Sequence, residues 1–138
     1  MPMIEGISRL QCARAVYDFA VDGGAISAIP LRGDTIPDNA VIMGGFVDVI
    51  TTCTTAGADA GTMALHVNAA NDIVNAVAVN AANPGQYDAG QRAIIPKINT
   101  PESTSVKTTA ARSITATIAG QAFTAGKFHV FLFYVLSE

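Results

Sequence analysis

The chain has 138 residues, of which 50% are hydrophobic and only 14% are charged. This length suits one domain around one core, and the charged share lies well below the about 25% that is usual in soluble globular proteins. The net charge is −3 and there is no basic cluster to neutralise a phosphate backbone, which argues against nucleic-acid binding. Low charge is instead typical of a surface that is covered by partners.

Residues 1–6 lack the basic leader and apolar stretch of a signal peptide. No apolar run reaches the length of a membrane-spanning helix, so we expect no membrane partner. Cys12 and Cys53 lack metal-finger spacing and lie in segments that alternate in polarity. They are best interpreted as two small buried hydrophobic residues, and a disulfide between neighbouring strands stays open.

Alternating polarity, interrupted by Gly, Pro and Asn, predicts eight or nine strands with a turn about every ten residues. Alanine is abundant and would favour helix, but the period of two outweighs its propensity. The strands are expected at residues 11–21, 25–31, 40–53, 62–68, 69–82, 91–95, 104–108, 113–118 and 127–136.

Three of these segments carry more specific expectations. The second strand should end at Pro30 and at a turn formed by Arg32-Gly33-Asp34. These three residues also match a cell-adhesion tripeptide, and we interpret the match as a structural turn and not as an adhesion site. The pair Gly44-Gly45 should form a bulge or bend that lets one strand serve two packed sheets. Residues 69–82 are read as a strand, with a short helix capped by Asn71 or Asp72 as the alternative.

The segment 128–136 is apolar on both faces, whereas a strand with one face in water alternates. One face can line the core, and in so short a chain the simplest cover for the other is a second copy. The predicted oligomer interface comprises Phe128, Val130, Phe131, Leu132, Phe133, Tyr134 and Val135.

The fold class that follows is all-β: a jelly-roll-like antiparallel β-sandwich of about eight strands in one domain, residues 11–138, after an N-terminal arm, residues 1–10. An immunoglobulin sandwich would usually show a buried Trp, and this chain has none. An up-and-down barrel is a weaker alternative because the loops at 54–61 and 97–111 are long.

Searching for chemistry yields no nucleophile elbow, no metalloprotease motif and no phosphate-binding glycine loop. His66 and His129 are isolated on strands, where packed or interface histidines are the usual case. His129 could meet its symmetry mates near an axis, and assembly would then weaken near pH 5–6. We expect no enzyme, no catalytic residue, no cofactor and no metal.

Two further candidates are weak. Aspartates could meet in pairs and invite calcium, but the loop 57–61 lacks alternating oxygen ligands; these pairs are Asp34 with Asp38 and Asp59 with Asp72. Tyr87 and Phe123 lie in loops, where an exposed aromatic side chain could bind sugar or contact a partner, although such residues usually pack locally.

Five segments together resemble small structural proteins of tailed bacteriophages, over most of the chain from about residue 11 to 137. They are residues 13–19, 36–40, 48–54, 107–112 and 123–128. The resemblance is to capsid decoration proteins, also called cement or auxiliary head proteins. It implies a small trimeric β protein without catalytic residues, made in the host cytoplasm and located in the virion on the outside of the head.

The same resemblance implies two partners, the chain itself and the major capsid protein, and a role in stabilising the expanded shell. An apolar arm can order on a partner, so we expect Met3, Ile4, Ile7 and Leu10 to contact the capsid, with a frayed terminus as the equal alternative. The competing functional hypothesis is a head-fibre or tail β-domain that binds host surface glycans.

Overall fold

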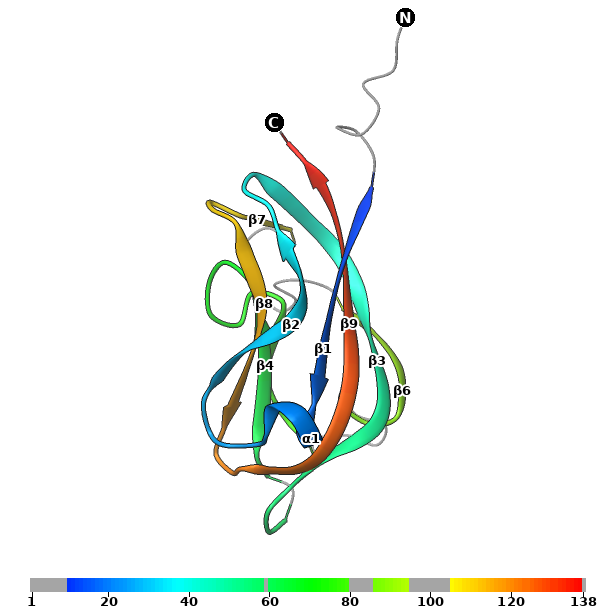
Figure 1. The fold of residues 1–138 in the computed structure, drawn as a ribbon, viewed down its shortest axis with the longest axis vertical. Coiled ribbons are helices and arrows are strands. Elements are labelled where there is room, and N and C mark those ends of the chain that lie inside the picture. Colours follow the sequence, from blue (N-terminus) through cyan, green and yellow to red (C-terminus); the bar gives the residue numbers. More distant parts are fainter. Residues whose placement is uncertain (1–9, 59, 80–85, 95–104, 138) are drawn as a thin grey trace, which may run out of the picture.

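The computed structural model describes residues 10–58, 60–79, 86–94 and 105–137, in which the regular elements are antiparallel strands and one helical turn (Figure 1). The all-β prediction is confirmed. The elements are β1 (Gln11–Asp18), α1 (Phe19–Asp22), β2 (Ala28–Ile36), β3 (Ala40–Thr55), β4 (Thr62–His66), β5 (Val74–Ala78), β6 (Gly90–Ile94), β7 (Val106–Lys107), β8 (Arg112–Ala119) and β9 (Phe123–Leu136).

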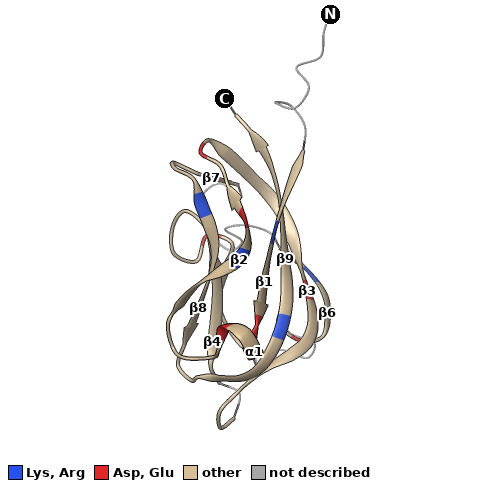
Figure 2. Cartoon of the chain, in the orientation of Figure 1, with Lys and Arg blue, Asp and Glu red and all other residues tan. Residues whose placement is uncertain are grey.

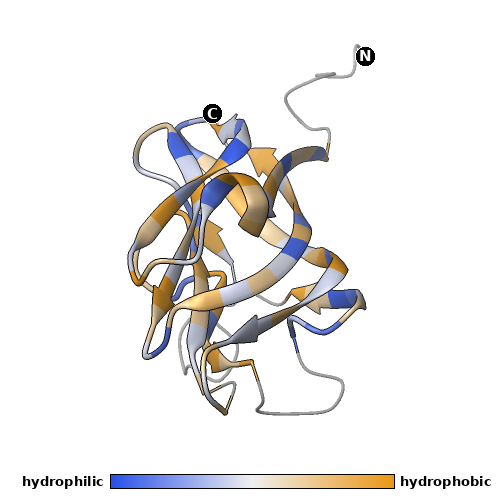
Figure 3. Ribbon diagram, turned by 60° about the horizontal axis from the view of Figure 1, so that its bottom comes forward, coloured by the Kyte–Doolittle hydropathy of each residue, from blue (hydrophilic) through white to orange (hydrophobic). Residues whose placement is uncertain are grey.

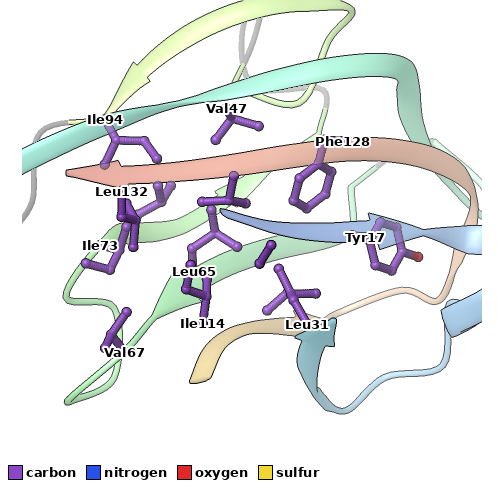
Figure 4. Close-up of a cluster of buried hydrophobic side chains, with 14 of the residues drawn as sticks. Tyr17, Leu31, Val47, Leu65, Val67, Ile73, Ile94, Ile114, Phe128 and Leu132 are labelled. Atoms are coloured by element: carbon purple, nitrogen blue, oxygen red, sulfur yellow. The ribbon is translucent and has the colours of Figure 1, made fainter. Parts of the chain in front are cut away.

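The strands follow one path in the order β5-β4-β8-β2-β1-β9-β3-β6, and β7 pairs with β3. This path curves so that β5-β4-β8-β2 and β1-β9-β3-β6 enclose one core (Figure 4). The two halves join where β1 pairs with β2, through Ala15 opposite Gly33 and Val16 opposite Arg32. A sandwich-like arrangement is therefore confirmed, and the jelly-roll connectivity stays a prediction.

The core is built from the inward residues of the alternating strands, as the period of two predicts. Hydrophobic and hydrophilic residues alternate along the strands in Figure 3. At one end of the core, Tyr17 stacks on Phe128 with the ring centroids 5.3 Å apart, and Tyr87 lies 5.5 Å from Phe128. The Tyr17 hydroxyl donates to the Gly23 carbonyl at 2.7 Å, so this buried polar atom is satisfied.

The first strand ends earlier than predicted. Asp18 caps a helical turn by accepting a hydrogen bond from the Ala20 N–H at 3.0 Å, and the turn ends at Gly23 with φ 76°. The Asp22 carboxylate accepts a hydrogen bond from the Asp18 N–H at 2.8 Å. These local side-chain bonds compete with strand pairing, and they place Val21 outside the core with 66% of its surface exposed.

The expectation that β2 ends at an Arg32-Gly33-Asp34 turn is wrong. The tripeptide lies inside β2, where the strand leaves β8 and pairs with β1. A Cβ on Gly33 would overlap the Arg14 carbonyl, so glycine permits this close approach. Asp34 accepts from the Arg14 N–H at 2.9 Å, and Arg32 forms a two-bond pair with Asp22. The tripeptide therefore joins the two halves of the sheet.

The predicted irregularity at Gly44-Gly45 is confirmed, because the register between β3 and β9 shifts between Ile42 and Gly44. The strand β9 begins at Phe123, earlier than the predicted residue 127. Gly126 lies within this strand, and the position needs glycine because a Cβ there would approach the Cys53 Sγ to 2.6 Å. Both cysteines are free thiols, with Cys12 exposed and Cys53 buried.

Of the predicted strand at 69–82, residues 80–82 lie outside the described residues, and residues 69–79 are only partly a strand. Residues 67–73 form a turn around Asp72, which is buried and accepts from the N–H groups of Val67, Asn68 and Ala69 at 2.9, 2.9 and 2.7 Å. The strand β5 follows it. Asp72 thus caps this turn rather than a helix, and Asn71 adopts φ 59°.

Few residues along the described ribbon are charged (Figure 2). Within the described part of the chain, no helix is long and apolar enough to cross a membrane.

Candidate functional site

The outward side of β1, β9 and β3, together with the adjoining β6, is the surface most unlike ordinary solvent-facing sheet. Residues that lie opposite each other across an antiparallel ladder share a face. Here Arg14, Phe131, Phe46 and Ala93 form one row across the four strands. We call this side of β1-β9-β3 the outer face.

The end of the outer face nearest the described termini is apolar. Phe133 lies opposite Cys12 on one side and Gly44 on the other, and Val135 lies opposite Val41. The neighbouring Leu10 and Met43 are among the exposed large hydrophobic residues, at 60% and 61% of their surface. We call this region, together with Phe46 and Phe131, the apolar half. It comprises Leu10, Cys12, Val41, Met43, Phe46, Phe131, Phe133 and Val135.

An aromatic cluster stands at the centre of the outer face. Phe46 stacks on Phe131 with the centroids 4.6 Å apart and an interplanar angle of 19°, and it lies 6.1 Å from the Phe133 ring. The Arg14 guanidinium carbon is 6.0 Å from the Phe131 centroid, within cation–π range. All three phenylalanines are half-buried in the single chain.

The guanidinium of Arg14 is held by His129. Its Nε donates to the His129 Nδ1 at 3.2 Å, and its terminal nitrogen lies 2.7 Å from the same atom. Arginine can only donate, so Nδ1 must be the unprotonated acceptor nitrogen. Partial burial, followed by the nearby Arg14 charge, lowers the pKa of His129 below its usual value. The observed pair thus requires a neutral imidazole.

The remaining end of the outer face carries its charged side chains, beside Val16, which lies opposite His129, and Ile50 of β3, which is 54% exposed. Asp48 lies opposite His129 and accepts from Gln91 Nε2 at 2.9 Å. Lys127 lies 3.9 Å from the Asp18 carboxylate. Along β1, β9 and β3, two basic side chains, Arg14 and Lys127, are therefore balanced by two acidic ones.

The predicted interface residues divide between two environments. Phe131, Phe133 and Val135 point outward, as the two-faced pattern indicated. The others belong to the core of the same chain; they are Phe128, Val130, Leu132 and Tyr134. Of the predicted arm, Leu10 is exposed, while Met3, Ile4 and Ile7 lie outside the described residues.

Sequence reasoning missed Arg14 and Phe46. Arg14 read as an ordinary polar position of the first strand, and Phe46 directly follows the irregular Gly44-Gly45 pair, where alternation loses its register. Only the strand order, which places β9 between β1 and β3, brings both against Phe131. The available signal was that β3 and β9 both carry outward phenylalanines. These strands are neighbours in the sheet but lie far apart in the sequence, so the sequence alone did not bring them together.

The other candidate side chains have structural roles. Tyr87 is buried and its hydroxyl donates to the Met63 carbonyl at 3.3 Å, so its proposed exposure for sugar binding is wrong. Phe123 is buried against Tyr17. His66 contacts Thr117 Oγ1 at 3.2 Å. Asp59 lies outside the described residues, and the residues that are described contain no group of three His, Cys, Asp or Glu placed to hold a metal.

A shallow hollow of about 280 Å³ lies beside the outer face, at the junction of β1 and β2. Both arginines that line it have partners within the chain: Arg14 contacts His129, and Arg32 contacts Asp22. The backbone N–H of Arg14 is taken up by Asp34. The hollow lies at the short ladder that joins the two halves of the sheet, and its charged groups are already paired within the chain.

No family model and no curated protein matches the sequence. Solved structures do match the fold. A chain of the cyanophage Pam1 capsid asymmetric unit is similar with a TM-score of 0.68 and 14% identity, over 99% of this chain and 91% of that one. A chain from the acidic stable capsid structure of Helicobacter pylori bacteriophage KHP30 has a TM-score of 0.63 and 10% identity, over 95% and 90%.

A chain of the Ralstonia phage GP4 capsid is similar with a TM-score of 0.63 and 16% identity, over 99% of this chain and 90% of that one. All three structures are phage capsids, and each match spans nearly the whole of both chains. The chain therefore has a fold that also occurs in chains of bacteriophage capsid structures.

Proposed function

We propose that this chain is a structural protein of a bacteriophage head: a decoration, or cement, protein that binds the outside of the shell as a trimer and stabilises the expanded capsid. The observation that carries the proposal is the likeness of the fold, over 99% of this chain, to a chain of the cyanophage Pam1 capsid asymmetric unit. A structural, non-catalytic role agrees with a surface on which the candidate side chains are engaged in packing and pairing.

The action of such a protein is thermodynamic. A subunit that binds the expanded shell, and neither the precursor shell nor dispersed capsid protein, lowers the free energy of the expanded shell by mass action. At a free concentration 100 times the dissociation constant, each site contributes about 2.7 kcal/mol. Many such sites, each bridging neighbouring capsomers of the major capsid protein, raise the temperature at which the shell opens.

The apolar half of the outer face and the segment that leads into it supply the surfaces for assembly. Leu10, exposed at the start of β1, adjoins the apolar half, and residues 1–9 precede it. We assign contact with the shell to Met3, Ile4, Ile7 and Leu10, and contact between copies to the outward residues of β9.

The test uses expanded heads of the cognate phage prepared without this protein. Adding the purified chain should give co-sedimentation with expanded heads and should raise the temperature at which they release DNA or dye. A chain that begins at Leu10 should lose the co-sedimentation and keep its fold. Equal opening temperatures with and without saturating protein would overturn the proposal, and specific binding on a glycan array would favour a head-fibre or tail role.

A further inference from the structure

We propose that the apolar half of the outer face is covered by a second copy of this chain, and that protonation of His129 weakens this contact by releasing Arg14. The inference rests on the proposed function, because it names the surface and the regulation of the assembly that a decoration protein needs. Its test, however, uses the purified chain alone.

The first step is the chemistry of the face. Phe46, Phe131 and Phe133 form a contiguous aromatic surface, and Met43 extends it with a side chain that is more than half exposed. Leu10, at the margin of this surface, is left to the shell contact. Large exposed apolar patches mark interaction sites, whereas single exposed hydrophobic residues do not. Aromatic residues and methionine with an adjoining arginine are the side chains enriched at protein interfaces.

The second step is the choice of partner, which the charges decide. Arg14 and Lys127 are balanced by Asp18 and Asp48 along the three strands, so the outer face offers no net charge to a strongly acidic or basic surface. A second copy has the same balance and the same apolar half. Arg14 of one copy can approach Asp48 of the other without repulsion between the faces as a whole, which is the complementarity that a self-contact needs.

The third step is the dependence on His129. The neutral imidazole accepts both bonds from Arg14 and so holds the guanidinium beside the Phe131 ring. A protonated His129 loses this acceptor and places a second positive charge against Arg14. Lys127 on β9 adds to the repulsion, whereas Asp48 on β3, which is bonded to Gln91 of β6, opposes it in part.

Release of Arg14 removes the cation from the aromatic surface and puts charge where the second copy must pack. Burying an unpaired charge at an interface is costly, so the dissociation constant should rise as the solution becomes acidic. The lowered pKa of His129 supports this direction, because the pair keeps the proton away.

The experiment measures association of the full chain by sedimentation velocity across a concentration series at pH 7.5 and pH 5.0. We expect association at pH 7.5 and a dissociation constant at least about tenfold higher at pH 5.0. His129→Asn keeps an acceptor near the Nδ1 position but cannot be protonated, so this variant should associate equally at both values. A wild-type chain that associates equally at both pH values would overturn the His129 mechanism.

The two cysteines report the location of the contact. Cys12 lies opposite Phe133 on the outer face and is exposed in the single chain, while Cys53 is buried, with its pKa raised to about 12 by burial. At pH 7.5, Cys12 should react with maleimide in dilute protein and be protected when the chain associates. Cys53 should stay unreactive in both states, which shows that the fold is intact.

Phe131→Gln should abolish the association, and the matched control Val21→Gln, at an exposed hydrophobic residue of α1, should not. Association with Cys12 still reactive would overturn the assigned surface. A monomer at all concentrations, with Cys12 protected only when phage heads are added, would assign the face to the shell. That outcome would overturn this inference and leave the proposed function standing. Self-association without binding to phage heads would support this inference and overturn the proposed function.

Discussion

Gly45 packs against the backbone carbonyl of Phe131, so that a Cβ on Gly45 would overlap the carbonyl oxygen. The two residues belong to β3 and β9, the long paired strands at the centre of the outer face. The missing side chain allows these strands to approach, and this approach aligns Phe46, the next residue, with the Phe131 ring.

Gly45→Ala should therefore destabilise the protein by about 2–4 kcal/mol, because the backbone of β3 or β9 must move and Gly45 also has φ 159°. The adjacent Gly44→Ala is the matched control: its Cβ would meet only the Ile94 carbonyl, at 3.4 Å, an ordinary contact. Denaturant unfolding measures both. Equal losses for the two variants would show that the close approach to Phe131 is not what constrains this pair.

The carboxylate of Asp72 by itself holds the backbone of the turn at residues 67–73, by accepting hydrogen bonds from three N–H groups. Asp72→Ala leaves the N–H groups of Val67, Asn68 and Ala69 without their acceptor, and it should cost about 2–3 kcal/mol. Asp38→Ala, at an exposed aspartate with a bond to the next N–H, should cost less than about 1 kcal/mol. Thermal or denaturant unfolding compares them. A loss at Asp72 no larger than at Asp38 would contradict the assigned role.

The strands were largely predictable because their inward residues recur with a period of two, as Ala13, Ala15 and Tyr17 do in β1. The departures occur where a local side chain or a glycine overrides that pattern. Asp18 turned the predicted end of the first strand into α1, and Gly33 and Gly126 allowed close approaches inside strands where glycine suggested turns.

The candidate site was half predictable for a similar reason. Phe131 and Phe133 stood out because a strand that is apolar on both faces needs two covers. Their contacts with Arg14 and Phe46 depend on which strands flank β9, and on a register that shifts at Gly44. No local pattern carries that information, because pairing partners are set by the packing of the whole chain.

Acid should destabilise the fold through His129. Its pKa is lowered in the folded protein by partial burial and by Arg14, so the unfolded chain binds the proton more tightly. The contribution of His129 to the free energy of unfolding is therefore fully present above the pKa of the unfolded chain, about 6.5. This contribution is lost as the pH falls below that value towards and through the folded pKa. Denaturant unfolding of dilute protein between pH 7.5 and 5.0 measures this loss, and His129→Asn should make the dependence shallower. An identical pH profile in the variant would refute it.

Alkaline titration should show that the phenols of Tyr17 and Tyr87 resist ionisation in the folded protein. Burial raises the pKa of Tyr17 and of Tyr87 well above the usual value near 10, so neither phenol should ionise at pH 11 while the protein is folded. Absorbance at 295 nm should then reach its full three-tyrosine value only after denaturant is added. The full value at pH 11 in protein that still shows native circular dichroism would contradict the burial of these rings.

The place of β9 in the chain has a consequence for biogenesis. It lies between β1 and β3 in space but follows both in synthesis. Until Phe123–Leu136 has been made, β1 and β3 have no common neighbour, and the rings of Tyr17, Tyr87 and Phe46 lack the β9 rings that pack against them. Such non-local pairing is slow to form, so a growing chain stalled before residue 123 should be a preferred client of chaperones and a preferred substrate of proteases.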